Sequence, residues 1–284
     1  MAKPLITLYT PGNRKDLIAK AGKFKPDGIV LDLEDAVPIQ LKAQTRDELG
    51  ELIPTLDIVS LVRVNSEPQY LQKDLEAVVG NNLYGICLPM AETVDQIVVA
   101  DKIMTWLERE RGIEPDKVKL LLLIETALGV RNCYDMCVAA KRVESIVFGS
   151  AQDGDLQRDL RSDFSIEGPE IMYARQKSLL DARAAKLPYV LDGAFSDIKN
   201  EDTLRRDCTL SKRLGYNGRT LIYPGHIAIA RECYAPSPKE VAHYQAVVQA
   251  FEDAEKQGLA AINYGGKLID YAMYKKAKSF LEII

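Results

Sequence analysis

The sequence predicts a closed parallel (β/α)₈ barrel, the TIM-barrel fold, followed by a C-terminal helical extension. Two observations support this fold. Short apolar segments alternate along the chain with segments of helix length, which is typical of parallel α/β proteins. Several apolar segments also end in charged residues, as in Leu-Asp-Leu-Glu-Asp at 31–35. Charged side chains gathered at strand C-termini are typical of a barrel active site.

Eight strand–helix units follow one another. The strands are expected at 5–10, 28–33, 58–64, 84–90, 119–125, 145–149, 188–192 and 219–223. The helices are expected at about 13–23, 41–53, 68–79, 93–111, 128–141, 168–186, 200–214 and 226–233. Helix starts are marked by Thr93 with Gln96, by Pro169 and by Asn200. No glycine-rich dinucleotide fingerprint follows the first strand, which disfavours a Rossmann sheet.

The barrel domain is expected at 1–235 and the extension at 236–284. Ser237, Pro238 and Glu240 are typical of a helix N-terminus, and this helix should continue to about Lys256. A loop at 263–267 then leads to a last helix. These roughly 45 residues exceed what a barrel needs. They could cap the barrel or reach over a neighbouring subunit.

Composition limits the classes of function. The chain has 284 residues, a net charge of −4 and a pI near 5.5, which argues against nucleic acid as the main partner. No apolar segment approaches the roughly 20 residues of a membrane span, and no secretory signal is recognised, so we expect no membrane partner. The five cysteines read as buried, reduced thiols of a cytoplasmic protein. Only His226 and His243 occur, so any metal should be a hard cation held by carboxylates.

Five motifs occur in a characteristic order. They are Tyr-Thr-Pro-Gly-Asn-Arg at 9–14, Leu-Asp-Leu-Glu-Asp-Ala-Val at 31–37, Arg-Val-Asn at 63–65, Ile-Glu-Thr-Ala-Leu-Gly at 124–129 and Gly-Lys-Leu-Ile-Asp at 266–270. Together they resemble the citrate lyase β-subunit family of the HpcH/HpaI aldolase superfamily, over essentially the whole chain. The resemblance implies a Mg²⁺-dependent lyase that splits or forms the C–C bond of acyl thioesters such as citryl-, malyl- and citramalyl-CoA. It also implies a homotrimer, or a dimer of trimers, whose C-terminal segment completes a neighbour's site.

The resemblance places the metal on Glu125 and on an aspartate after the next strand. The family usually has this aspartate four residues after the phenylalanine, where this chain has Gln152. Because the local sequence carries an apparent insertion, Asp153 is the preferred ligand and Asp155 is the alternative. The segment at 221–226 also departs from the family's usual Ile-His-Pro-x-Gln, so we expect a divergent member.

Further roles follow from the same resemblance and from residue chemistry. The planar guanidinium of Arg63 suits bidentate capture of the 2-oxoacid carboxylate. Glu34 and Asp35 are expected to position water and the metal. The resemblance makes Asp270 the acid/base residue that reaches a neighbour's active site. The substrate and CoA contacts are assigned to Arg14, Arg63, Lys42 and Arg46, with a solvated helix face as the alternative for the last two.

Two other functions stay open on the sequence. One is a 2-oxoacid aldolase that does not use CoA. The other is a non-catalytic thioester-binding protein that kept the barrel but lost the metal site, a hypothesis motivated by the shifted Asp153. The acyl group, and the choice between CoA and an acyl carrier protein, are left open as well.

Overall fold

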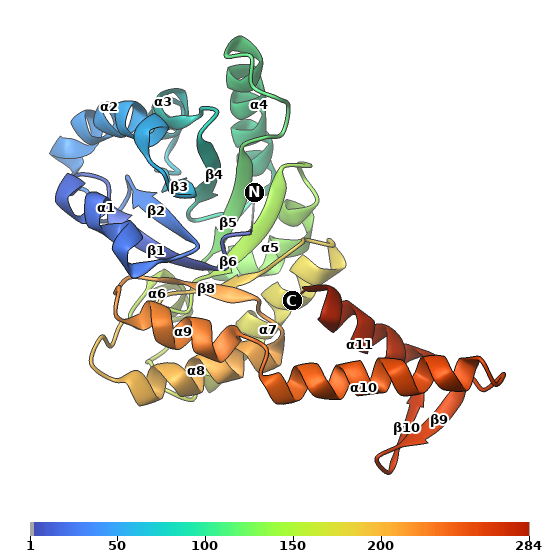
Figure 1. Ribbon diagram of the computed structural model, residues 1–284. Coiled ribbons are helices and arrows are strands. Elements are labelled where there is room, and N and C mark those ends of the chain that lie inside the picture. The colour runs from blue at the N-terminus through green and yellow to red at the C-terminus, as the bar shows by residue number, and fades with distance from the viewer. Residues whose placement is uncertain (1–2, 284) are drawn as a thin grey trace. The chain divides into compact units, whose positions relative to one another are not determined.

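The predicted barrel is confirmed. The computed structural model describes residues 3–283, which divide into two compact units, one ending at Tyr234 and one beginning at Ala235. In the first unit, eight parallel strands pair in chain order, and the last strand pairs with the first (Figure 1). Closure leaves no strand edge of the barrel exposed to another chain.

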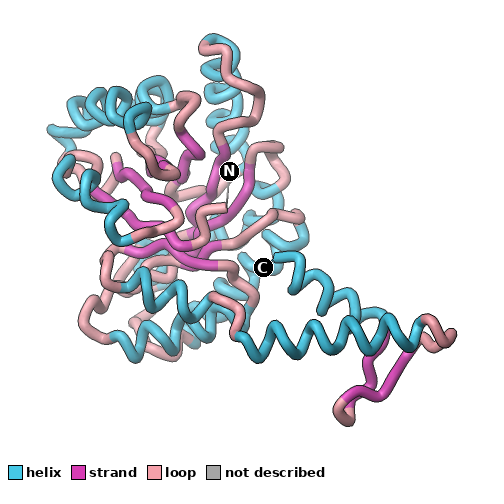
Figure 2. The backbone as a smooth tube through the Cα atoms, in the orientation of Figure 1, coloured by secondary structure: helices cyan, strands magenta, loops and turns pink. Residues whose placement is uncertain are grey.

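The strands of the barrel are β1 (Ile6–Pro11), β2 (Gly28–Asp32), β3 (Ser60–Arg63), β4 (Leu83–Leu88), β5 (Lys119–Ile124), β6 (Val143–Phe148), β7 (Leu191–Asp192) and β8 (Gly218–Leu221). Its helices are α1 (Lys15–Ala21), α2 (Lys42–Leu52), α3 (Pro68–Val78), α4 (Val94–Glu110), α5 (Ala127–Cys137), α6 (Asp155–Leu160), α7 (Pro169–Ala184), α8 (Glu201–Leu214) and α9 (His226–Tyr234). Short 3₁₀ turns occupy Gly22–Phe24, Ile39–Leu41 and Ile53–Thr55. The helices lie outside the strands of the barrel (Figure 2).

The apolar strand segments are apolar on both faces because each face packs in a different core. In β5, Leu121 and Leu123 point into the barrel interior, whereas Leu120 and Leu122 pack under the surrounding helices. This alternation follows from the two-residue period of a strand. A parallel strand buried on both faces therefore reads as a continuous apolar run, and this was the signal in the sequence.

The helix starts follow the predicted capping chemistry. Thr93 and Gln96 form a reciprocal capping box before α4, and the Asn200 side chain accepts from the Thr203 N–H at the start of α8. Pro169 occupies the first turn of α7. The Thr93 and Asn200 side chains satisfy backbone N–H groups that have no partner inside the helix, whereas Pro169 has no N–H that needs one.

The second unit is built from α10 (Pro238–Glu255), a hairpin of β9 (Ala261–Tyr264) and β10 (Lys267–Asp270), and α11 (Tyr271–Ile283). The predicted capping box of Ser237 and Glu240 starts α10. Val247, Phe251, Ile269 and Ala277 form a small core of this unit, with partly buried aromatic rings around it. The unit therefore has packing of its own.

Three elements differ from the sequence prediction. The segment expected as a loop at 263–267 contains the end of β9, a two-residue turn and the start of β10. The turn residues Gly265 and Gly266 have φ values of 60° and 79°. Two successive positive φ values suit a tight hairpin turn. The helix α6 was not predicted, because it is only six residues long. The seventh strand pairs only over Leu191 and Asp192, since Pro188 lies at its expected start.

A buried ion network supports the end of the barrel where strands begin. Arg142 lies directly before β6, and its side chain is fully buried. It donates to both carboxylate oxygens of Glu108 at 3.0 and 2.9 Å and to Asp101 at 2.6 Å. The Glu108 carboxylate also accepts the backbone N–H groups of Asp116 and Val118. The network ties α4 to the strands β5 and β6.

Arg142→Met should lower the free energy of unfolding by about 3–5 kcal/mol, because it leaves Glu108 buried without its cation. Urea unfolding at neutral pH measures this change. The matched control is Arg205→Met, which breaks an ion pair with Glu232 whose side chains are 42% and 68% exposed, and little change is expected there. Equal effects of the two substitutions would contradict the assignment.

Candidate active site

A cavity of about 460 Å³ lies at the C-terminal ends of the barrel strands, where TIM-barrel active sites are found. Seven of the eight strands, or the loops that follow them, contribute to its walls. The lining consists of Tyr9, Pro11, Asp32, Asp35, Ala36, Arg63, Leu123, Glu125, Val147, Gly149, Ala151, Gly154, Asp155, Gly193, Ala194, Thr220 and Ile222. The wall is therefore mostly apolar, with acids and one guanidinium at defined positions.

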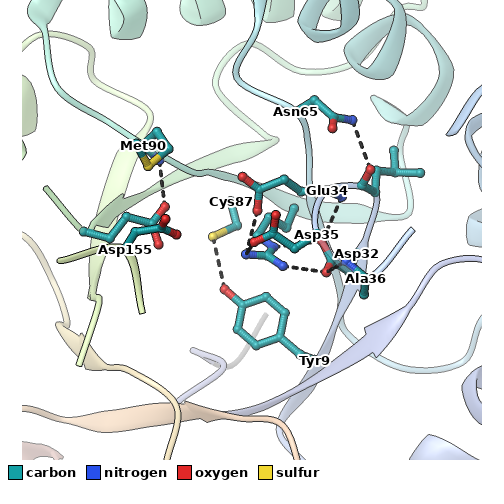
Figure 3. Close-up of polar contacts among 12 residues, drawn as sticks. Tyr9, Asp32, Glu34, Asp35, Ala36, Asn65, Cys87, Met90 and Asp155 are labelled. Carbon is teal, nitrogen blue, oxygen red and sulfur yellow. Dashed lines mark hydrogen bonds and ion pairs between the residues drawn. The ribbon is translucent and has the colours of Figure 1, made fainter. Parts of the chain in front are cut away.

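The Asp32–Arg63 pair is the centre of the site. The two residues are partners in the register of β2 and β3. The Nε and Nη2 groups of Arg63 donate to the two carboxylate oxygens of Asp32 at 2.8 and 2.6 Å. The same oxygens accept the backbone N–H groups of Glu34 and Ala36 at 3.0 and 3.2 Å (Figure 3). This bidentate contact orients both the guanidinium and the turn after β2.

The rest of the Arg63 guanidinium faces two further acids and an aromatic ring. Its Nη1 lies 2.6 Å from Glu34 Oε2 and 3.6 Å from Asp35 Oδ2. The guanidinium carbon lies 5.1 Å from the centroid of the Tyr9 ring, a cation–π contact. The structure thus brings Arg63, Glu34 and Asp35 together, and Glu34 is the closer and more buried acid.

Lys42 and Arg46 have internal partners, unlike the expected contacts with CoA phosphates. The Lys42 Nζ donates to two backbone carbonyls of the segment after β2 at 2.8 and 2.6 Å, and to Asn65 Oδ1 at 2.6 Å. Arg46 is buried and donates to Asp74 Oδ1 at 2.7 Å. Because these contacts use their charges inside the protein, both residues support the loops after β2 and β3 instead of presenting a cation to a phosphate.

Glu125 follows β5 and is almost completely buried. Its Oε1 accepts the backbone N–H of Met90 at 2.8 Å. Met90 has a φ of 48°, in the left-handed region that non-glycine residues seldom adopt. Strained backbone of this kind concentrates at functional sites.

Of the two aspartates considered as the second ligand, Asp155 lines the cavity with Glu125 (Figure 3). Asp153 does not line it; its side chain is exposed, and its backbone N–H donates to Gln157 Oε1 at 2.8 Å. The turn at 151–154 takes up the insertion, so that α6 begins with Asp155 at the cavity. The geometry therefore favours Asp155, the alternative, over Asp153, the preferred assignment.

The short helix α6 is anchored next to Glu125. The Asp159 Oδ2 accepts the N–H of Ala127, the first residue of α5, at 2.7 Å. Leu156 is fully buried on the same short helix. One hydrogen bond thus links the segment that carries Asp155 to the segment that carries Glu125.

Arg14 and Asp270 each have partners close to them in the chain. The Arg14 side chain is 53% exposed at the start of α1, where it pairs with Asp16 at 2.8 Å. Asp270 is exposed at the end of β10 in the second unit, and its Oδ1 accepts the N–H groups of Ala272 and Met273 at the start of α11. The Arg14 side chain is not part of the cavity lining.

The site has more acids than cations. Burial raises the pKa of Glu34 to about 8. The charge of Arg63 acts in the opposite direction, but the same guanidinium also donates to Asp32. Burial likewise raises the pKa of Glu125 to about 7, with Asp155 among the carboxylates that raise it further. The cavity lining holds four acids and one basic side chain. A bound cation would relieve this imbalance.

These donors suit a magnesium ion. Mg²⁺ commonly takes only one or two protein carboxylates and keeps its other positions for water and substrate. No group of three or more His, Cys, Asp or Glu side chains within residues 3–283 has the arrangement of a metal site. Glu125 and Asp155, which line the same cavity, are two carboxylates of the kind that magnesium takes.

Two residues of the site were missed as site residues by the sequence analysis. Asp32 was noted only as part of an acidic segment, although it holds Arg63. Tyr9 was quoted only as the first letter of a motif, although it lines the cavity. The signal for Asp32 was its register partner Arg63 on the adjacent predicted strand, because parallel neighbours end side by side.

This chain belongs to the HpcH/HpaI aldolase/citrate lyase family. The model of that family matches residues 5–224, which is most of the barrel unit. The resemblance recognised from the motifs is thereby confirmed. Within the described residues, no helix is both long enough and apolar enough to cross a membrane.

Individual relatives cover nearly the whole chain. Citrate lyase subunit beta of Haemophilus influenzae is 31% identical over 279 residues, which is 97% of this chain and 94% of the relative. The (3S)-malyl-CoA thioesterase of Cereibacter sphaeroides is 32% identical over 268 residues, 93% of this chain and 88% of the relative.

Solved structures share the fold. CitE of Mycobacterium tuberculosis, in complex with magnesium, acetoacetate and coenzyme A, superposes with a TM-score of 0.80 at 24% identity, covering 99% of this chain and 98% of that one. The citrate lyase beta subunit of M. tuberculosis, complexed with oxaloacetate and magnesium, gives a TM-score of 0.68 at 25% identity, with 83% and 98% covered.

Glu34→Gln tests the raised pKa of Glu34. A carboxyl whose pKa is about 8 in the folded protein and 4.5 in the unfolded chain contributes stability that is full below pH 4.5 and is lost as the pH rises to 8. The variant lacks this loss, so its stability relative to the parent should increase between pH 4.5 and 8 by a few kcal/mol.

Urea unfolding at several pH values, with EDTA to remove metal ions, measures the difference. A difference between Glu34→Gln and the parent that does not depend on pH would show that Glu34 is ionised with its ordinary pKa in the folded state.

Proposed function

We propose that this protein is a Mg²⁺-dependent carbon–carbon lyase that cleaves, or forms, a 3-hydroxyacyl-CoA thioester such as citryl-, malyl- or citramalyl-CoA. The products of cleavage are acetyl-CoA, or a related acyl-CoA, and a 2-oxoacid. One observation carries the proposal: Glu125, Asp155 and Arg63 line a single cavity at the end of the barrel. Family membership and the magnesium and oxaloacetate of the M. tuberculosis citrate lyase beta subunit support it.

Glu125 and Asp155 would hold the metal. When bound, Mg²⁺ lowers the pKa of the substrate hydroxyl and polarises the carbonyl that forms from it. The Met90 N–H holds the Glu125 carboxylate by a hydrogen bond. Asp159 accepts the N–H of Ala127 and so links the helix that carries Asp155 to the segment after Glu125. Asp35, which is more exposed, is placed to position water near the metal.

Arg63 binds the carboxylate of the 2-oxoacid half. Asp32 takes one edge of its guanidinium, so the orientation of the group is set before substrate arrives. Glu34 lies against Nη1 of Arg63, so the protonation state of Glu34 changes how much positive charge Arg63 presents to the substrate. Arg14, half exposed beyond the end of β1, is assigned to the CoA end of the substrate.

Asp270 is the proposed acid/base residue, and it serves the site of a neighbouring subunit in a homotrimer. Its exposure at the end of a hairpin in a separate unit supports a role outside its own barrel. In cleavage it takes the proton of the 3-hydroxyl group and then returns that proton to the carbon of the departing acyl enolate. A cytoplasmic location goes with this function and stays a prediction.

The alternatives are separated by one experiment, a screen of citryl-, malyl- and citramalyl-CoA with and without Mg²⁺, with products identified by mass spectrometry. Release of acetyl-CoA and a 2-oxoacid only with Mg²⁺ supports the proposal. Turnover of free hydroxyacids alone would favour a CoA-independent aldolase. Binding of CoA, seen as thermal stabilisation without turnover, would favour a non-catalytic protein. The position of Asp155 weakens that last hypothesis, because Glu125 and Asp155 both line the cavity and leave a candidate metal site in place.

Glu125→Gln and Asp155→Asn should each lower Mg²⁺-dependent turnover by at least a hundredfold, because each removes a charged ligand at nearly constant volume. Asp153→Asn is the matched control, two residues away and outside the cavity, and it should keep turnover within about threefold of the parent. The assay is initial-rate kinetics over a range of Mg²⁺ concentrations. Loss of activity in Asp153→Asn with normal Asp155→Asn would reverse the ligand assignment.

Mixed trimers test whether Asp270 acts between subunits. Glu125→Gln and Asp270→Asn trimers should each be inactive, because every site lacks one group. If the two variants are unfolded and refolded together, roughly a quarter of sites combine an intact Glu125 with a neighbour's intact Asp270. Lyase activity should therefore recover to about that fraction of the parent. No recovery, with mixed trimers demonstrated by mass, would place Asp270 in its own subunit's site or outside catalysis.

A further inference from the structure

Tyr9 occupies a position in the cavity that none of the roles above explains. It lies on β1, and its ring packs in the barrel interior beside Cys87 and Leu123 while also lining the cavity. Arg63 lies over one face of the ring, with its guanidinium carbon 5.1 Å from the centroid. The ring therefore supports the Arg63 guanidinium.

The hydroxyl group of Tyr9 lacks a strong partner. Among the residues that the structure describes, its one polar contact is the Cys87 Sγ at 3.8 Å. A thiol is a weak hydrogen-bonding group. Buried phenols usually find a better partner, as Tyr84 does lower in the same barrel, where its hydroxyl donates to Glu144 at 2.6 Å.

The surroundings keep Tyr9 as a donor. Burial raises the pKa of its phenol well above the usual value, and the Cys87 thiol is also held protonated because burial raises its pKa to about 12. Glu125 and Asp32 are close enough to raise the pKa of Tyr9 further. A neutral phenol in the same cavity as Arg63 and Glu125 is thus available to an oxygen atom that enters the cavity.

We propose that the Tyr9 hydroxyl donates a hydrogen bond to an oxygen of the 2-oxoacid half of the substrate, and so selects for that half together with Arg63. This inference rests on the proposed lyase function. In this arrangement Glu125 and Asp155 would hold the metal, and Arg63 would bind the carboxylate of the 2-oxoacid. The Tyr9 hydroxyl would bind a further oxygen of the same molecule. CoA binding does not involve Tyr9.

Tyr9→Phe removes the hydroxyl and keeps the ring under Arg63. Its dissociation constant for pyruvate or oxaloacetate, measured by calorimetry with Mg²⁺, should rise about tenfold to a hundredfold, as expected for a hydrogen bond to a charged group. Affinity for free CoA should not change. The melting temperature should also stay the same, because the hydroxyl interacts only weakly with the Cys87 thiol in the free protein.

Two controls separate binding from structure. Tyr84→Phe makes the same chemical change in the same barrel, but it breaks a strong hydrogen bond, so it should lower the melting temperature and leave 2-oxoacid affinity unchanged. Cys87→Ala removes the thiol that faces the Tyr9 hydroxyl and should also leave affinity unchanged.

The outcomes are distinct. A parent protein that binds neither 2-oxoacid in the presence of Mg²⁺ contradicts the proposed function itself, and this inference with it. A parent that binds, with Tyr9→Phe binding equally well, overturns the role of Tyr9 alone. Equal weakening by Cys87→Ala would likewise overturn it, since the effect would then arise from packing. Selective weakening in Tyr9→Phe supports the inference.

Discussion

The bidentate pair between Asp32 and Arg63 is the interaction on which the rest of the site depends. It joins two adjacent strands at their C-terminal ends, and the same aspartate accepts two backbone N–H groups of the following turn. One carboxylate thereby determines the direction of the guanidinium and the path of the acidic segment. Lys42, which holds two carbonyls of that segment, supports the arrangement from the other side.

The second constraint is charge. One guanidinium serves Asp32, Glu34 and Asp35, and little of its charge is left for Glu125 and Asp155. Burial of so many acids is unfavourable unless a cation or protons accompany them. In the protein without a bound cation, this unfavourable burial raises the pKa values of Glu34 and Glu125. A divalent ion at the cavity would convert the same imbalance into binding energy. Where the strands begin, Arg142 holds Glu108 by two hydrogen bonds and Asp101 by a third.

The sequence was sufficient for the barrel because most strands are buried on both faces, and because several helix starts carry a capping side chain or a first-turn proline. It was also sufficient to gather Arg63, Glu34 and Glu125 at one end, since parallel strands end together. The sequence was insufficient where a side chain binds residues that are distant in the chain. Lys42 and Arg46 look like surface cations on a helix, yet they are used by buried polar groups.

The preference for Asp153 over Asp155 rested on spacing counted along the chain. In the structure the turn at 151–154 precedes α6, and Asp155, the first residue of α6, lines the cavity. Short helices and tight glycine turns, such as α6 and the β9–β10 hairpin, carry too few residues for a periodic pattern. Tyr9 was missed because an aromatic residue in an apolar strand looks the same whether or not its hydroxyl has a partner.

The central claim is that the acidic excess around Arg63 is completed by one divalent cation held by Glu125 and Asp155. The most direct measurement is a crystal structure of the protein grown with Mn²⁺, with anomalous difference density used to locate the metal. The account predicts a single strong peak in the cavity, in contact with a carboxylate oxygen from each of these two residues. A peak at Asp153 or at the Asp32–Asp35 segment, or an empty cavity at saturating Mn²⁺, would contradict it.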